Sequence, residues 1–164
     1  MTSASGYQRA ERTGAPPWLL RGARNGLVAG AVMAMVVMIL GLTDQGLFAA
    51  PSSIWAFWAG PAGYHPRDLD ISFVLGAMSH MMNSAVFGVV FAFLVTRILR
   101  PSGVLASAMA GVAFALAALA LMWFVVLPIG ANGEIVKGAA AGWIWIAGHV
   151  MFGGVGGLLS WRWR

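Results

Sequence analysis

The sequence predicts an all-α membrane protein whose four transmembrane helices form two helical hairpins. Of the 164 residues, 60% are hydrophobic and 9% are charged, whereas charged residues make up about 25% of an ordinary soluble domain. The hydrophobic residues gather in four stretches, each near or above the roughly 20 residues that cross a hydrocarbon core about 30 Å thick. Such stretches favour helices over a β-barrel, whose strands are short and alternating. The predicted spans are about 26–42, 71–96, 104–131 and 138–161.

A polar leader precedes the first span. Residues 1–24 lack hydrophobic periodicity and include Pro16 and Pro17, so we expect a disordered cytoplasmic leader there. A cleaved signal peptide is the alternative, but both the leader and the apolar stretch are long for one. Residues 25–164 then form one transmembrane domain.

The loop after the first span carries a shorter helical signal. Residues 51–58 are predicted to form a short helix with a serine cap. The aromatic side chains of this segment suit the headgroup layer of a membrane. We expect an interfacial anchor, and a lid over an outward-facing site is the alternative.

Charge placement predicts the orientation in the membrane. Eight basic residues lie before the first span, between the second and third spans, or after the fourth, whereas only Arg67 and Lys137 lie in the other two loops. The positive-inside rule therefore places both termini in the cytoplasm. Topology thus explains the net charge of +5 without nucleic acid as a partner, and the lipid bilayer is the predicted partner. The eight basic residues are Arg9, Arg12, Arg21, Arg24, Arg97, Arg100, Arg162 and Arg164.

The two halves of the chain repeat each other. The context of Gly30 in the first span matches that of Gly111 in the third, and the context of His80 in the second matches that of His149 in the fourth. Two hairpins of the same orientation, related by an axis along the membrane normal, are therefore predicted. Each span also carries small residues four apart, a spacing that lets membrane helices approach closely. These residues include Gly22, Gly26, Gly30, Gly76, Ser84, Gly88, Gly103, Ser107, Gly111, Gly153 and Gly157.

His80 and His149 are the candidate functional residues. At about 1.5 Å per residue, both lie roughly 15 to 18 Å below the outer surface, near the midplane. An ionisable ring at that depth is costly and marks a functional site by default. We expect both rings to face a common interior space.

Three roles are open for this pair. The imidazoles could bind a cofactor, either as axial ligands of haem b or around a transition metal, with Met78, Met82 and Met151 as soft ligands for copper(I). Alternatively, each ring bonds a neighbouring carbonyl or hydroxyl and fixes helix packing. The third role is the handling of a proton or substrate.

Enzymatic activity is not predicted. No Asp, Glu, Lys or Arg lies inside a predicted span, and the chain has no cysteine. Phosphate-binding loops, a nucleophile elbow and an HExxH pair are also absent from the sequence. Catalysis would rest on the two intramembrane histidines and His65 alone.

Four short motifs resemble a known family. They are Ala29-Gly30 before a Met-rich run, His80 with Ser84 and Gly88, Val125-Val126-Leu127-Pro128, and Gly148-His149 with Gly153 and Gly157. Over roughly residues 26–160 the chain resembles an uncharacterised family of small four-helix bacterial inner-membrane proteins, a domain of unknown function. The resemblance implies a bacterial inner membrane and a histidine at both positions. Phe152, where tyrosine is common, and the Trp-rich loop depart from the pattern.

These observations predict a non-enzymatic structural or accessory component of a membrane complex, in contact with other subunits or with copies of itself, and with a cofactor site at His80 and His149. A small b-type cytochrome with bis-histidine haem is the alternative. A small-solute permease is the third hypothesis.

The predicted orientation can be tested with topology reporters. Fusions near Pro101 and Arg164 should report the cytoplasm, and fusions near Ser52 and Glu134 should report the opposite side, because the basic residues divide in that way. A fusion near Pro101 that reports the outside would contradict the four-span topology.

Overall fold

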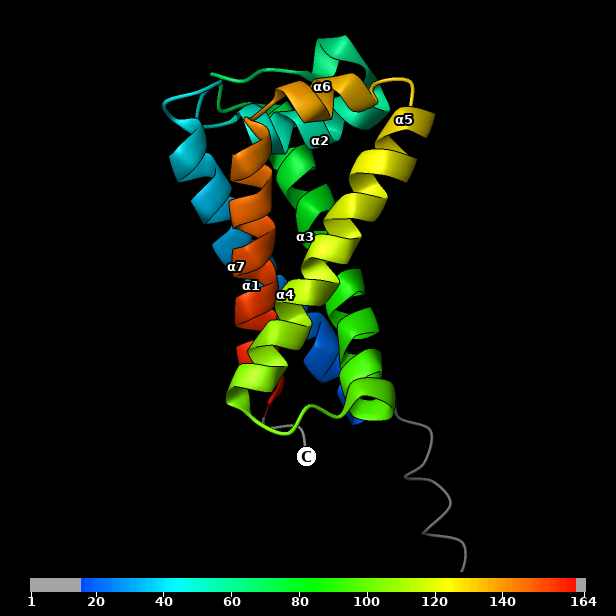
Figure 1. Cartoon of the computed structure of the whole chain (residues 1–164). Helices are drawn as coiled ribbons and strands as arrows, with labels where there is room; N and C mark the ends of the chain where they lie inside the picture. The colour runs from blue at the N-terminus through cyan, green and yellow to red at the C-terminus, as the bar shows by residue number, and fades with distance from the viewer. Residues whose placement is uncertain (1–15, 162–164) are drawn as a thin grey trace, which may run out of the picture.

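Four membrane-length helices form the bundle in the computed structural model, which describes residues 16–161 (Figure 1). No strand occurs in that part of the chain, so the predicted all-α fold class is confirmed. Helix α1 begins and helix α7 ends at the same end of the bundle (Figure 1). The spans are α1 (Pro17–Gly41), α3 (Ile71–Leu94) continued by η3 (Val95–Leu99), α4 (Val104–Leu121) continued by η4 (Met122–Val126) and α5 (Leu127–Ile129), and α7 (Gly142–Ser160).

The first helix begins earlier than predicted. It starts at Pro17 and not near residue 26, so residues 17–24, assigned above to the leader, are helical. Proline is favourable in the first turn because its missing N–H would have no helical partner there. The ring of Trp18 also packs on Phe93 of α3, with centroids 5.9 Å apart. The prediction for the rest of the leader, residues 1–15, lies outside the described residues.

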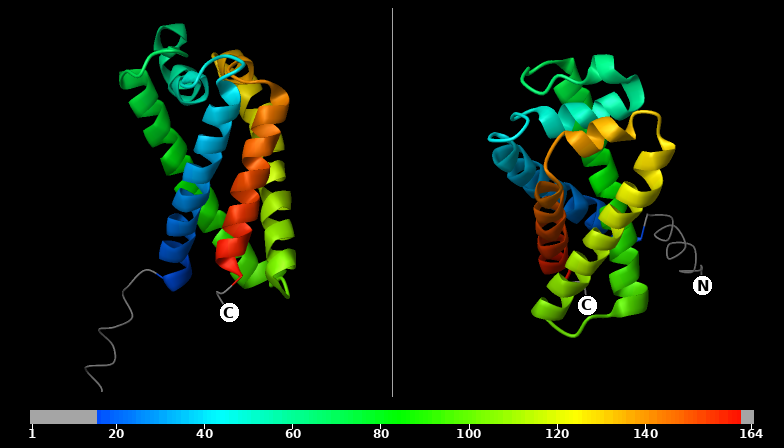
Figure 2. Two further views of the ribbon diagram at one scale, coloured as in Figure 1. Left: turned by 90° about the vertical axis from the view of Figure 1, so that its left-hand side faces the viewer. Right: turned by 45° about the horizontal axis from the view of Figure 1, so that its top comes forward.

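Two short helices cover the other end of the bundle. Helices α2 (Ala49–Ala59) and α6 (Gly133–Gly138) lie across it, with the turn η2 (Pro61–Gly63) after α2 (Figures 1 and 2). Helix α6 ends at Gly138, where the fourth span was expected to begin, and α7 starts only at Gly142.

The predicted serine cap of α2 is wrong. The helix begins at Ala49, and its serines lie inside it. Ser52 donates its hydroxyl to the carbonyl of Phe48 at 2.8 Å, and Ser53 donates to that of Ala50 at 2.7 Å. Both serines are fully buried, and bonding to the preceding turn of the helix satisfies their hydroxyl protons without water.

Glycine lets the helix backbones touch at the end where α1 begins. A Cβ atom added to Gly26 of α1 would overlap the Ser84 carbonyl and lie 2.8 Å from the Cα of Gly88 on α3. A Cβ added to Gly153 of α7 would lie 2.6 Å from the carbonyl carbon of Gly111 on α4. Because lipid is as apolar as the side chains, such backbone contact provides the packing energy between membrane helices.

The two hairpins share one contact register. Gly30 meets Ser84 in the first hairpin just as Gly111 meets Gly153 in the second. One turn further toward the same end, Gly26 meets Gly88 as Ser107 meets Gly157. The structure therefore supports the repeat that the sequence predicts.

Three of the four seams of the bundle are packed. Helix α1 packs on both α3 and α7, and α7 packs on α4, whereas α3 and α4 share few contacts. The contacts between α3 and α4 include the ring of Phe114 against those of Phe91 and Phe87, at centroid distances of 5.3 and 6.2 Å. Helices α3 and α4 thus form an open seam.

Polar bonds tie the loop end of the bundle together. Asp44 accepts a 2.7 Å bond from the backbone N–H of Ala141, at the start of α7. Asp70 caps α3 by accepting from the N–H of Ser72 at 2.9 Å, and its other oxygen pairs with His65 at 2.6 Å. These carboxylates hold the connecting loops to the first turns of α3 and α7.

Alanine at the contact glycines should destabilise the bundle. Gly88→Ala and Gly111→Ala each place a Cβ against backbone, and overpacking of this kind costs about 1 to 3 kcal/mol. Thermal unfolding in detergent measures the loss. Gly154→Ala on α7 is the matched control, because nothing lies within 4 Å of the added atom. If Gly111→Ala melts like Gly154→Ala, the backbones do not touch at this position.

Candidate functional cavity

A cavity of about 280 Å³ lies where the open seam meets the covering helices. Every span contributes to its wall, and α2 and α6 form its cover. None of the lining side chains is charged. They are Met33, Ile54, Phe57, Trp58, His80, Asn83, Ser84, Phe87, Ala115, Ala118, Leu119, Met122, Trp123, Val126, Leu127, Val136, Trp145, His149 and Phe152.

The third span reaches the cavity through an irregular turn. Pro128 has no N–H and would clash with the carbonyl four residues before it in a regular helix. The chain widens into the π-helical turn η4, in which Leu127 donates its N–H to the carbonyl of Met122. Such wide turns occur often at functional sites, and this one supplies Met122, Trp123 and Val126 to the wall.

His80 joins two helices. Its Nε2–H donates a 3.0 Å hydrogen bond to the carbonyl oxygen of Gly30 on α1. A carbonyl can only accept, so the proton of the neutral ring lies on Nε2 and Nδ1 carries the lone pair. The backbone carbonyl of His80 in turn accepts the hydroxyl of Ser84 at 2.8 Å.

His149 bonds within its own helix. Its Nδ1–H donates a 2.8 Å bond to the carbonyl oxygen of Trp145, one turn earlier in α7. By the same argument, Nε2 of His149 carries the lone pair. The two histidines occupy matching places in the repeat and line one cavity, but they hold opposite tautomers.

Further polar groups lie in or next to the cavity wall. Asn83 is exposed on α3, and its amide has no hydrogen-bond partner within residues 16–161. Trp145 is only 7% exposed, and its indole N–H finds no acceptor in the same part of the chain. A second cavity of about 160 Å³, between α1, α2 and α3, also borders on Trp145 and His80.

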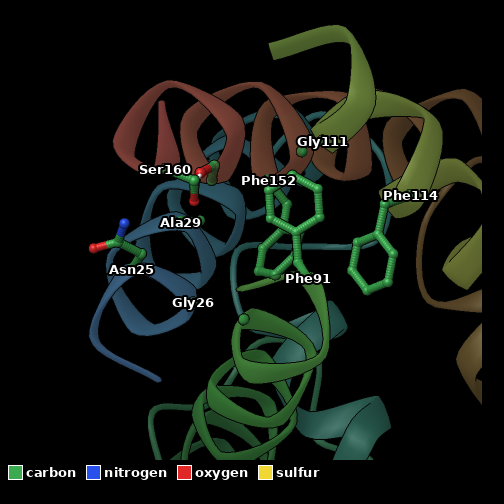
Figure 3. Close-up of a pocket in the computed structure, with 11 residues that line it drawn as sticks. Asn25, Gly26, Ala29, Phe91, Gly111, Phe114, Phe152 and Ser160 are labelled. Atoms are coloured by element: carbon green, nitrogen blue, oxygen red, sulfur yellow. Dashed lines mark hydrogen bonds between the residues drawn. The ribbon is translucent and has the colours of Figure 1, made fainter. Parts of the chain in front are cut away.

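Phenylalanines close the cavity toward the end where α1 begins. Figure 3 shows Phe91, Phe114 and Phe152, from three different helices, gathered at the centre of the bundle. The void that they line with Gly26 and Gly111 measures about 10 Å³, which is room for about one water molecule. Phe152 lines both the cavity and this small void, so its ring lies at the boundary between them.

Side-chain size explains why one seam is open. The two hairpins can be aligned by matching Gly30 with Gly111 and His80 with His149. In this alignment the packed seam between α1 and α7 corresponds to the open seam between α3 and α4. Gly156 and Ser160 of α7 are buried in the packed seam, and their counterparts on α3 are Phe87 and Phe91. The phenyl rings of Phe87 and Phe91 are much larger than the side chains of Gly156 and Ser160. These rings therefore hold α3 away from α4.

Some of the predicted ligands lie elsewhere. Met78 and Met82 are 63% and 65% exposed, and with Met151 they are absent from the cavity wall, where Met33 and Met122 lie instead. The expectation of copper(I) ligands at these three methionines is therefore wrong, because they occupy the outer faces of their helices. Within residues 16–161, no group of three or more His, Cys, Asp or Glu side chains could hold a metal ion.

The fold and the cavity define a multi-pass membrane protein of four spans, with a pocket that all four spans and the covering helices line. No protein-family model, curated protein or solved structure matches this chain. The resemblance seen in the sequence stays a prediction.

The two histidines should differ in their effect on stability. His80→Leu removes a bond between helices, whereas His149→Leu removes one within a single helix. Hydrogen bonds between membrane helices contribute about 0.6 kcal/mol on average and up to about 1.7 kcal/mol, so His80→Leu should give the lower unfolding temperature in detergent. His80→Gln, whose amide reaches about as far as Nε2, should recover part of the loss. Equal effects of both Leu variants would contradict this assignment.

Proposed function

We propose that this protein is a non-enzymatic accessory component of the bacterial inner membrane that holds a small lipid-soluble ligand between His80 and His149. Both termini lie in the cytoplasm, so the cavity occupies the outer half of the membrane. The protein presents this ligand to other subunits of a membrane complex or to a second copy of itself.

One observation carries this proposal. Two histidines from corresponding places in the repeat line a single cavity, and each keeps one ring nitrogen without a partner in residues 16–161. Both nitrogens keep exposed surface and are not sealed within packed protein, so a molecule in the cavity can reach them. Polar groups at membrane depth that helix packing does not use are better explained by binding than by packing alone.

The closed floor of the cavity favours binding over transport. A permease needs a path that reaches both sides of the membrane. Next to the cavity, toward the end where α1 begins, the void lined by Phe91, Phe114 and Phe152 measures only about 10 Å³. Solute passage would require these rings to move.

The geometry fits a small ligand better than haem b. The Nε2 of His80 is engaged by Gly30, so axial ligation would have to break that bond or use Nδ1, which lies next to the Cβ carbon. The cavity of about 280 Å³ is also at the lower limit of the roughly 300 to 1,000 Å³ of pockets for drug-sized ligands. The residues present therefore do not fit a bis-histidine haem.

Filling the cavity should release the ligand. Ala118 lines the cavity, so Ala118→Phe should occupy its space, whereas Ala117→Phe on the exposed side of α4 should not. We expect protein purified in mild detergent to retain a small molecule, detected by extraction and mass spectrometry, in the wild type and Ala117→Phe but not in Ala118→Phe.

The same preparations distinguish the alternatives. A Soret band in the absorption spectrum of the wild type that disappears in His149→Ala would show that the protein binds haem, and would contradict this proposal. Identical extracts from the wild type and Ala118→Phe would refute a ligand in this cavity.

A further inference from the structure

The tautomers of the two histidines define which ligand chemistry the cavity can satisfy. Because both bonded nitrogens donate to backbone carbonyls, both free nitrogens, Nδ1 of His80 and Nε2 of His149, are acceptors in the neutral rings. A ligand that satisfies both must bring its own hydrogen-bond donors. A carbonyl group, which only accepts, would leave them unpaired.

The rest of the wall indicates a neutral ring. No Asp, Glu, Lys or Arg lines the cavity, so nothing there balances a charged ligand. Aromatic side chains favour flat, apolar partners, and the wall carries six phenylalanine and tryptophan side chains: Phe57, Trp58, Phe87, Trp123, Trp145 and Phe152. A cavity of about 150 Å³ already holds benzene, so about 280 Å³ has room for a substituted ring.

The open seam provides a lateral way in. The cover is tied down by the side-chain amide of Asn132, which donates to the carbonyl of Phe57 on α2 at 3.2 Å. The floor is closed by phenylalanine rings. Helices α3 and α4, in contrast, share few contacts, and Asn83 of α3 both lines the cavity and is exposed. A ligand can therefore pass between these helices from the bilayer.

We propose that the cavity binds a neutral aromatic ring with hydroxyl donors, of the quinol or phenol class, drawn from the bilayer between α3 and α4. The hydroxyl groups donate to Nδ1 of His80 and Nε2 of His149. Asn83, which can donate or accept, meets the polar edge of the ring at the opening, and an apolar tail extends between the helices into lipid. This inference rests on the proposed ligand-binding function and names its ligand class.

Three probes of nearly equal size test the donor requirement. Trimethylhydroquinone has two hydroxyl donors, whereas trimethylbenzoquinone and the dimethyl ether of the hydroquinone have none. Calorimetric titration of the full chain in lipid nanodiscs, without oxygen, should give a Kd for the hydroquinone about tenfold or more below those of the other two. The preference should shrink in His149→Phe, which loses an acceptor but no bond between helices.

The outcomes separate this inference from the proposed function. Equal binding of all three probes, abolished by Ala118→Phe but not by Ala117→Phe, would overturn the donor requirement and leave the cavity as a binding site. Failure of every probe to bind, together with identical extracts from these two variants, would refute both. A hydroquinone that carries a decyl tail should still bind, because the tail can extend between α3 and α4 into lipid. If the tail abolishes binding, access between these helices is excluded.

Discussion

The close approach of helix backbones at glycine is the constraint on which the rest of the structure depends. Within a membrane, helices gain little from burying apolar side chains, so they associate where their surfaces fit most closely. Gly26 against Gly88 and Gly111 against Gly153 provide that fit near one end of the bundle. Two crossed helices that touch at one end diverge toward the other. The cavity under α2 and α6 lies in this divergent half.

The repeat explains both the regularity of the bundle and its opening. Within each hairpin, small residues meet in the same register, so the two helix pairs pack through the same kind of backbone contact. Between the hairpins, the packed seam uses residues such as Ala29 and Gly156, whereas the corresponding positions of the other seam include Phe87. Larger side chains at corresponding positions of otherwise similar hairpins, Phe87 for Gly156 and Phe91 for Ser160, thus leave one seam of the bundle open.

Backbone carbonyls decide what the histidines present to the cavity. A carbonyl oxygen accepts but never donates, so each bond to it places the imidazole proton on a known nitrogen and leaves a lone pair on the other. Gly30 does this for Nε2 of His80, and Trp145 for Nδ1 of His149. A packing role and a binding role are therefore compatible in this structure. One ring nitrogen bonds a backbone carbonyl while the other has no partner in residues 16–161 and is available to the ligand that we propose. A similar division of the two ring nitrogens is common around bound metals.

Local patterns in the sequence determined the four spans and the two-hairpin repeat. They also determined that His80 and His149 face a common interior space. The reason is that hydropathy and the spacing of small residues act along a single helix. The start of α1 at Pro17 could not be predicted from the sequence, because the ring of Trp18 contacts its partner, Phe93, only when the helices pack. Which methionines face inward depends on how each helix is rotated against its neighbours, so Met33 and Met122 entered the wall while Met78 and Met82 face outward. The open seam and the tautomer of His80 also required the tertiary structure. They arise from contacts between residues far apart in the chain, Phe87 with Phe114 and His80 with Gly30. The tautomer of His149, in contrast, follows from a bond to Trp145 one turn earlier in the same helix.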